Sequence, residues 1–368
     1  MAKVQNSNGK SNLPNNSGLS SREQLRKGIL SEVPKPKAKR HGLFKIDTAS
    51  NYIKEAALRP IPKQLFGELW FEGELCILFA DTGVGKSILA VNICHQISSR
   101  QNIISGLQTE ILPSKVLYFD FELSDKQFQV RYSDENGENG FGFNDNFKRL
   151  EFDSDAEPPN QMKYEDFVIY SIGEAIRQEM PKVVIIDNIT FLSTDNEKAK
   201  GALPLMKELK RLKQKHDVSM LVLAHTPKRD YYKPLSRNDL AGSKMLINFC
   251  DSSFAIGESC NDKHLRYIKQ IKVRNTEMVY DKSNVILCKI DKPDNNLLQF
   301  QFIDYDNEQR HLKEFEVRQE EDLLSQIITL HDDELLSFRD IEKKLKLSYS
   351  KVYRMYQKHK EIDNTVSP

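Results

Sequence analysis

The segment "CILFADTGVGKSILAVNI", residues 76–93, constrains the fold of this chain more than any other stretch. A short apolar run is followed by a tight turn with two glycines and a lysine, and then by residues with helical spacing. A strand, a glycine-containing turn and a helix in this order are the context of a phosphate-binding loop, because the loop N–H groups and the helix N-terminus face the anion. A chance glycine-rich turn is the alternative. We predict a working loop that binds ATP with Mg²⁺.

The residues of this loop have separable roles. Lys86 should reach the β- and γ-phosphates, and the Ser87 hydroxyl should ligate Mg²⁺. Ala80 stands where the usual pattern has its first glycine, but it lies at the loop entry, before the groups that touch phosphate. A methyl group is a small change there if the local φ is negative. The residues expected around the nucleotide are Thr82, Gly83, Val84, Gly85, Lys86, Ser87 and Ile88.

The surrounding sequence, from about residue 58 to 300, predicts an α/β fold. Apolar runs such as "KVLYFDFE", "VVIIDNITFL" and "VSMLVLAHT" alternate with amphipathic stretches such as "KGALPLMKELKRLKQKHD". Continuous apolar strands separated by amphipathic helices indicate a parallel sheet that is covered on both faces. The phosphate loop would then lie at the carboxyl edge of that sheet.

Acidic residues end two of the apolar runs. Asp187 ends "VVIID", where a carboxylate is costly unless it binds something. Beside a phosphate loop it should hold Mg²⁺ through water, whereas capping of the next turn is the alternative. Glu122 ends "VLYFDFE", and Asp120 lies two residues earlier on the same strand face. Either is a candidate for the base that activates the attacking water.

Three further segments carry a resemblance to a known family. "VLYFDFELSDKQFQVRY" resembles the strand-end Glu-x-Ser element of DnaB-type replicative helicases. "LSRNDLAGSKMLINFCDSSFAI" resembles their "SDLRGSGAIEQDAD" element, and "KQIKVRNTE" resembles the KxRN hairpin of DnaB-type and RepA-type helicases. In order over about residues 58–292, these segments and the phosphate loop resemble RecA-like ATPases of the RepA-type hexameric helicase group. Ala80 departs from that pattern, and we expect no DnaB-type N-terminal helical domain before the ATPase core.

The resemblance assigns further roles. It favours Glu122 over Asp120 as the base, and it makes His225, at the end of "MLVLAHT", the residue that contacts the γ-phosphate. It also implies that Lys272 and Arg274 cross a subunit boundary to the γ-phosphate of a neighbour. We therefore expect a homo-oligomer, most simply a hexamer. A solvated strand-end histidine and a basic edge strand are the alternatives.

Two segments are candidates for contact with DNA. The stretch "KRDYYKPLSRNDLAGSKM", residues 228–245, combines lysines and arginines with two tyrosines that can stack on nucleobases. The stretch at 337–362 reads as helix, turn, helix, with bases on its second helix, which is the layout of a major-groove reader. An ordinary surface loop and a protein-binding helical hairpin are the alternatives. The expected contacts are Lys228, Arg229, Lys233, Arg237, Lys351, Arg354 and Lys358.

Composition supplies the remaining boundaries. Residues 1–42 hold nine basic and two acidic residues and few apolar ones, so we expect a disordered basic arm. We expect a lead-in helix at 43–57, the ATPase domain at 58–300, a linker at 301–319, the helix-turn-helix domain at 320–362 and a tail at 363–368. Five cysteines without a CxxC pair, and no apolar run of about 20 residues, predict a cytoplasmic protein, and the resemblance to RepA-type helicases implies a prokaryotic one.

These observations favour an ATP-hydrolysing, ring-forming motor on DNA, a helicase for plasmid or mobile-element replication. A DNA-bound regulatory or loader ATPase that does not unwind DNA carries the same motifs and is the main alternative. A small-molecule kinase is disfavoured, because it has no use for the KxRN segment or for a DNA-binding tail.

Overall fold

The structure is a computed structural model of the 368-residue chain. It describes residues 39–366, apart from residues 154, 160–161, 193–198, 228–229, 241–243, 275 and 314. The chain divides into two units, Met1–Ile61 and Pro62–Pro368, which are described separately. The expected basic arm lies mostly outside the described residues.

The described part of the first unit is a small hairpin followed by a helix. β1 (Lys39–His41) pairs antiparallel with β2 (Phe44–Ile46), and α2 (Ala49–Ala57) follows. The side chain of Thr48 caps α2 by accepting from the Asn51 N–H. The lead-in helix predicted at 43–57 is therefore wrong in its first residues, because the chain pairs as a strand up to Ile46 and the cap starts the helix later.

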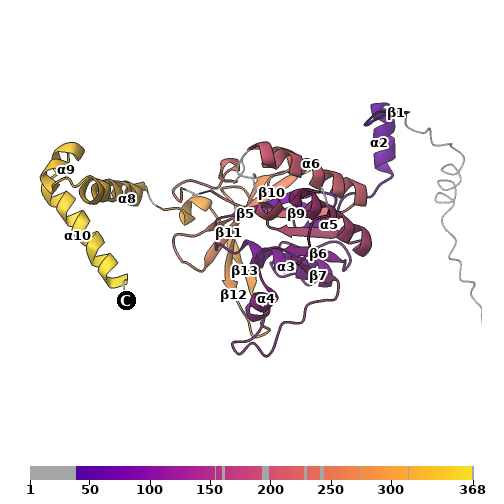
Figure 1. Ribbon diagram of the computed structural model, residues 1–368, viewed down its shortest axis with the longest axis horizontal. Helices are drawn as coiled ribbons and strands as arrows, with labels where there is room; N and C mark the ends of the chain where they lie inside the picture. The colour runs from indigo at the N-terminus through magenta and orange to yellow at the C-terminus, as the bar shows by residue number, and fades with distance from the viewer. Residues whose placement is uncertain are drawn as a thin grey trace, which may run out of the picture. The chain divides into compact units, whose positions relative to one another are not determined.

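A mixed sheet forms the centre of the second unit (Figure 1). Within the described residues its nine strands run in the order β13-β12-β11-β10-β5-β9-β8-β6-β7. The strands from β10 to β7 are parallel, and β11, β12 and β13 continue the sheet antiparallel. This topology confirms the predicted α/β class and fits a RecA-like core. The bounds are β5 (Leu75–Ala80), β6 (Val116–Asp120), β7 (Phe147–Glu151), β8 (Val183–Asp187), β9 (Ser219–His225), β10 (Ser252–Glu258), β11 (Leu265–Lys272), β12 (Val285–Asp291) and β13 (Gln299–Asp306).

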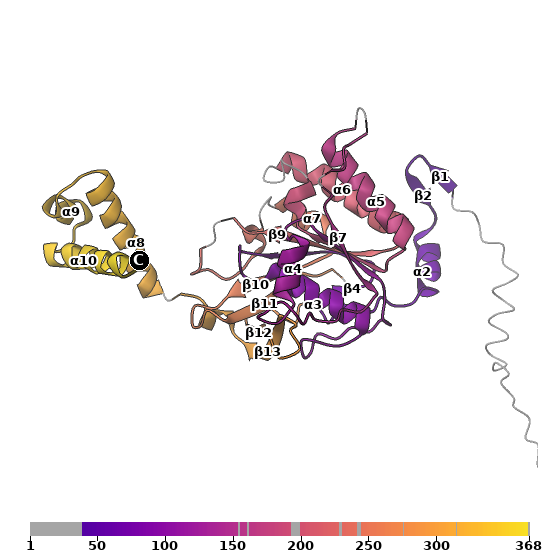
Figure 2. The same ribbon diagram turned by 60° about the horizontal axis from the view of Figure 1, so that its bottom comes forward.

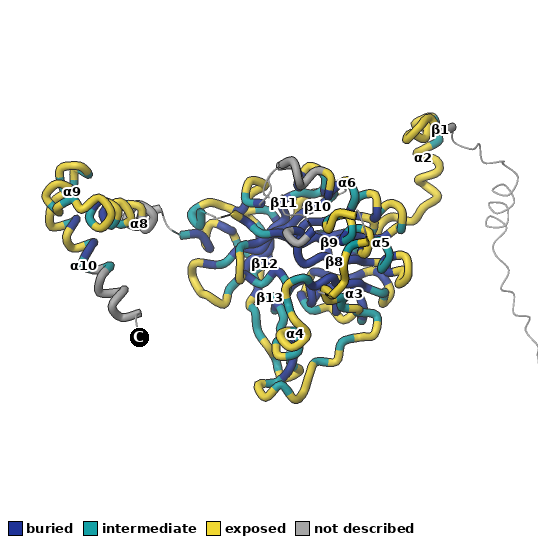
Figure 3. Tube along the Cα trace, viewed as in Figure 1, coloured by how far each residue is buried: buried dark blue, intermediate teal, exposed yellow. Residues whose placement is uncertain are grey.

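Helices cover both faces of this sheet (Figure 2). α3 (Lys86–Ser99) and α4 (Asp125–Arg131) pack on one face, and α5 (Tyr164–Glu179), α6 (Ala199–His216) and α7 (Lys244–Phe249) pack on the other. Successive strand residues alternate between the two cores: Tyr118 faces α3, and Leu117 faces α5 and α6. Figure 3 shows the strands as the buried centre of the unit. A short hairpin, β3 (Gln64–Phe66) with β4 (Trp70–Phe71), precedes β5.

The linker predicted at 301–319 is wrong at its start. Residues up to Asp306 belong to β13, and a 3₁₀ turn, η3 (Glu308–His311), follows with both of its end residues buried. The segment "QFQFIDYD" alternates apolar and polar residues, which is the pattern of an edge strand with one covered face. The charged residues around this segment made the alternation hard to recognise in the sequence. The core therefore extends about ten residues beyond the expected boundary at 300.

Helices form the C-terminal part of the chain. They are α8 (Phe315–Ile328), the π-helical turn η4 (Thr329–Asp333), α9 (Phe338–Leu345) and α10 (Tyr349–Val366). Ile327, Ile341 and Val352 are among the residues of their small shared core. The two helices expected at 337–362 are thus present as α9 and α10, and the side chain of Ser337 caps α9. None of the helices in the described ranges is long and apolar enough to cross a membrane.

Candidate nucleotide-hydrolysis site

The phosphate loop leaves the carboxyl end of β5 and ends at the first turn of α3. Gly83 and Gly85 both have positive φ, +78° and +111°. A Cβ on Gly85 would lie 2.8 Å from Cδ1 of Ile290 and 3.1 Å from the ring of Phe300. Glycine is therefore required at position 85 by conformation and by space. The hairpin β12–β13 forms the wall behind the loop.

Ala80 lies outside the part of the loop that turns. It is the last residue of β5 and pairs with His225 of β9 and Ile256 of β10, so its backbone is that of an ordinary buried strand. A strand residue needs no glycine, which explains how alanine can replace the first glycine of the usual pattern.

Lys86 is buried at the centre of the site. Its ammonium group donates to the carbonyl oxygens of Ala80, at 3.0 Å, and Asp81, at 2.9 Å. It also lies 3.1 Å from Nδ1 of His225. Burial lowers the pKa of Lys86, and the nearby carboxylate of Asp187 opposes this effect. The lysine therefore links the loop to the end of β9.

Donor groups face both ring nitrogens of His225. The Lys86 ammonium lies 3.1 Å from Nδ1, and the side-chain NH₂ of Asn188 lies 3.1 Å from Nε2. Nε2 lies 3.5 Å from Oε1 of Glu122, and the side-chain NH₂ of Asn188 donates to the same oxygen. His225 thus connects the lysine of the loop with the carboxylate of Glu122. Its place beside Lys86 and Glu122 is compatible with the predicted contact of His225 with the γ-phosphate.

Glu122 lies just beyond the end of β6, with its carboxylate partly exposed. The hydrogen bond from His225 lowers the pKa of Glu122, with Lys86 and Asn188 acting in the same direction and burial acting against them. The carboxylate is therefore ionised at neutral pH and able to accept a proton. Its oriented, half-exposed position supports the choice of Glu122 as the base.

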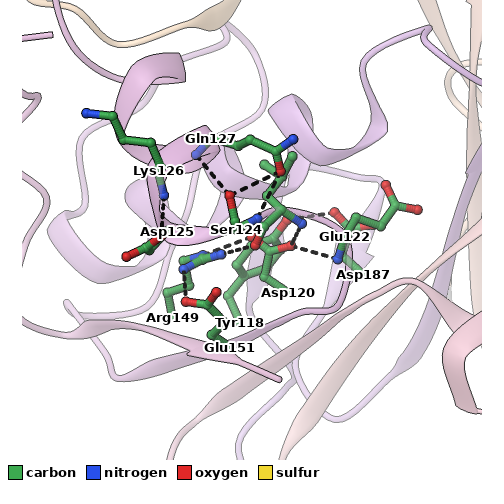
Figure 4. Close-up of polar contacts among 11 residues, drawn as sticks. Tyr118, Asp120, Glu122, Ser124, Asp125, Lys126, Gln127, Arg149, Glu151 and Asp187 are labelled. Atoms are coloured by element: carbon green, nitrogen blue, oxygen red, sulfur yellow. Dashed lines mark hydrogen bonds and ion pairs between the residues drawn. The ribbon is translucent and has the colours of Figure 1, made fainter. Parts of the chain in front are cut away.

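Asp120, the rival base, is engaged elsewhere (Figure 4). Its carboxylate is buried, pairs with Arg149 at 2.9 Å, and accepts from the backbone N–H groups of Glu122 and Leu123. A carboxylate with all of these partners organises the strand end and does not face a substrate. The geometry therefore favours Glu122 for the chemistry.

Asp187, at the end of β8, fits a metal ion. Its Oδ2 accepts from the Tyr118 hydroxyl at 2.6 Å, whereas its buried Oδ1 has no hydrogen-bond partner. Burial raises the pKa of Asp187 to about 6, and the nearby Ser87 and Tyr118 hydroxyls oppose this shift. An unsatisfied carboxylate oxygen beside the Ser87 hydroxyl is the donor set that a hard cation such as Mg²⁺ prefers. Bound there, the ion would neutralise charge on the phosphates.

The family follows from a comparison with known proteins. A family model described as "AAA domain" matches residues 46–230, half of the chain. The chain belongs to this AAA-domain family. Its members are P-loop proteins, so the chain is a nucleotide-hydrolysing P-loop ATPase. No match to a curated protein was found. The matched residues include the phosphate loop and His225 and end before β10 to β13.

Lys272 and Arg274 of this ATPase lie away from its own phosphate loop. Strand β11 runs antiparallel to β10 and ends with Lys272 beside Ser253, at the amino edge of the parallel strands. Lys272 donates to the carbonyl oxygen of Cys250 at 2.7 Å, and Arg274 donates to that of Asn248 at 2.9 Å. The pair therefore sits at the end of α7, on the sheet edge opposite to Lys86.

The loop after β9 crosses the ATPase from one sheet edge to the other. Near its start, the hydroxyl of Tyr231 donates to the Asp81 carboxylate of the phosphate loop at 2.8 Å. Near its end, the Arg237 guanidinium lies 3.4 Å from the carbonyl oxygen of Ile271, close to the end of β11. One continuous segment therefore contacts both the nucleotide site and the opposite edge.

The remaining expected DNA contacts are placed as follows. Lys233 is exposed and pairs with Asp230 at 3.0 Å, and Arg354 is exposed on α10, where Lys351 is partly exposed. Lys228, Arg229 and the side chain of Lys358 lie outside what the structure describes. The described residues are thus accessible, but they form two groups, one on the loop and one on α10.

Three site residues were missed from the sequence. Asn188 directly follows Asp187 at a strand end, so its position was a readable signal. Arg149 and Arg266 lie within strands and gave none. Arg266 of β11 donates to the Val84 carbonyl oxygen of the phosphate loop at 3.0 Å and pairs with Glu258. It supports the loop from the antiparallel part of the sheet.

Proposed function

We propose that this ATPase is a ring-forming motor that acts on DNA, a RepA-type helicase for plasmid or mobile-element replication. The observation that carries the proposal is the placement of Lys272 and Arg274. Two cations stand at the end of one strand, on the sheet edge opposite to the loop that would need them. They have no route to the phosphates of their own chain.

A head-to-tail ring gives this pair a function. Each subunit would present its phosphate-loop edge to the opposite edge of the next subunit, which is the heterologous contact that closes rings. Arg274, which is about half-exposed, could then reach the neighbour's γ-phosphate and stabilise charge on it. Hydrolysis would depend on assembly, because no single chain holds the complete site.

DNA is the substrate that the loop after β9 favours. Its tyrosine rings can stack on nucleobases, and its lysine and arginine side chains can contact phosphates. The bond from Tyr231 to Asp81 joins this loop directly to the phosphate loop. Binding of a DNA strand in the channel of a ring could therefore change the geometry of the nucleotide site. The basic side chains of α10 form a second group, which is suited to contact with duplex DNA.

Subunit mixing tests the ring. We expect Lys86→Ala to abolish turnover and Arg274→Ala to bind ATP but hydrolyse it about 10³-fold more slowly. In a ring mixed in equal amounts, about one interface in four joins an intact loop to an intact arginine, so hydrolysis should partly return. The matched control is Arg211→Ala, which removes a surface arginine that pairs with Glu208 on α6. This variant should keep full activity without being mixed with another.

Three results would contradict this proposal. A mixture that stays as inactive as its components would mean that the site is complete within one chain. Full activity of Arg274→Ala would remove the arginine from the chemistry altogether. Partial recovery without any effect of DNA on turnover would leave a ring ATPase and exclude the motor.

A further inference from the structure

Arg149 stands next to the proposed base without belonging to any motif of the sequence. It lies in β7, which pairs with β6 at the edge of the sheet, and its side chain is largely buried. Its Nε lies 2.9 Å from Oδ2 of Asp120, whose side chain is completely buried (Figure 4). The pair therefore connects the edge strand to the strand that carries Glu122.

The two side chains together hold the backbone beyond β6. Oδ1 of Asp120 accepts from the N–H groups of Glu122, at 3.2 Å, and Leu123, at 3.0 Å. The Arg149 guanidinium donates to the carbonyl oxygen of Leu123. The backbone of Glu122 and Leu123 is thus fixed by Asp120 and Arg149. The carboxylate of Glu122 extends away from this pair, toward Asn188.

The guanidinium is itself held on its other sides. It lies 4.9 Å above the ring of Phe128 in α4 and 3.2 Å from the Glu151 carboxylate. Ser124, which follows Leu123, caps α4 in a reciprocal box with Gln127, as Figure 4 also shows. Strand end, turn and helix start therefore form one rigid piece around Arg149.

We propose that Arg149 is a positioning residue for hydrolysis: through Asp120 it fixes the backbone from which Glu122 acts on water. This inference rests on the ATPase activity and the role of Glu122, and it needs neither the ring nor DNA. A general base works only at hydrogen-bond distance from the attacking water, and a displacement of about 1 Å can cost about 10²-fold in rate. Fixing the peptide supplies that accuracy.

A role in stability alone is the competing explanation, and substitution by lysine separates the two. Lysine keeps the positive charge beside Asp120, but it lacks the planar fork that reaches the carboxylate and the Leu123 carbonyl together. Arg149→Lys should therefore lower the single-turnover rate of ATP hydrolysis by about 10- to 10²-fold. Affinity for a fluorescent ATP analogue should change by less than about two-fold, because Glu122 does not bind the phosphates. Arg177→Lys, at an exposed pair with Glu174 on α5, is the control and should leave both quantities unchanged.

The decisive readout is the Glu122→Gln background. If Arg149 acts through Glu122, adding Arg149→Lys to Glu122→Gln should not lower the residual rate further. A loss in the double variant equal to the loss in the single one would overturn the proposal, and so would a folded Arg149→Lys that hydrolyses at the normal rate. Should Arg149→Lys fail to fold, the neutral pair Asp120→Asn/Arg149→Gln leaves no unpaired buried charge. It is measured in the same two backgrounds, and the same two outcomes decide.

Discussion

The loop that joins the nucleotide site to the opposite sheet edge is anchored by a buried ion pair. Lys269 of β11 and Glu308 of η3 approach to 2.5 Å, and the Glu308 side chain is fully buried. Glu308 accepts from the N–H of Leu235 at 2.7 Å, and Lys269 donates to the carbonyl oxygen of Leu235 at 2.8 Å. Leu235 lies between Tyr231 and Arg237, so the pair holds the middle of the loop.

Substitution of Lys269 by methionine should be strongly destabilising. It leaves the Glu308 carboxylate buried with only the Leu235 N–H as an identified donor, and the loss of one partner of a buried pair lowers the free energy of unfolding by about 3–5 kcal/mol. The double variant Lys269→Met/Glu308→Gln keeps an acceptor for that N–H and buries no charge. We expect it to lie within about 2 kcal/mol of the wild type.

Urea unfolding measures both effects. Trp70, the single tryptophan of the sequence, is fully buried in the same unit and reports its unfolding by fluorescence. If Lys269→Met lowers the free energy of unfolding by less than about 1 kcal/mol, the reasoning is refuted, because the ion pair would then behave like a solvent-exposed one. A double variant as unstable as the single one would show that packing of the lysine stem, not charge, is lost.

Three further predictions concern the site. Gly85→Ala should abolish ATP binding, because its Cβ would meet Ile290; calorimetry against Gly73→Ala, which has φ of +72° and open space around it, separates the clash from backbone strain. Tyr231→Phe should keep DNA affinity but lose much of the stimulation of turnover by DNA, because the ring remains and the bond to Asp81 is lost; Tyr232→Phe is its control, and equal stimulation in both variants would remove the coupling. In EDTA, Asp187→Asn should raise the free energy of unfolding at pH 8. Because the native pKa of about 6 exceeds the ordinary value of 3.8, the native state holds an extra proton between these pH values, so wild-type stability falls as pH rises from 4 to 6 and the variant lacks this fall; a constant difference from pH 4 to 8 would contradict the assignment.

The parts of the site that could be predicted share one property: they lie at a strand end or just after one, in the case of Lys86 at the end of the loop that follows β5. Lys86, Glu122, Asp187 and His225 follow apolar runs, and the carboxyl ends of parallel strands meet at one edge of a sheet. Apolar runs are visible in a sequence, so the residues that end them can be placed together without a structure. The location of the DNA contacts and the role of Lys272 and Arg274 remain predictions.

The parts that could not be predicted depend on contacts between distant segments. Asp120 was a reasonable rival base until its pairing with Arg149, 29 positions away, was visible. Arg266 supports the phosphate loop from 182 positions away. The sequence of β13 predicts a linker because its acidic residues and their neighbours are largely exposed. In each case the residue type was informative only after the partner was known.

Strand displacement on a forked DNA duplex tests the central claim most directly. The wild type should separate the strands with ATP and Mg²⁺, and the rate should fall as salt rises, because phosphate contacts release counterions. Glu122→Gln should bind ATP and the fork but leave the duplex intact. A wild type that hydrolyses ATP in the presence of the fork and never separates it, in either strand polarity, would contradict the motor and favour a regulatory or loader ATPase.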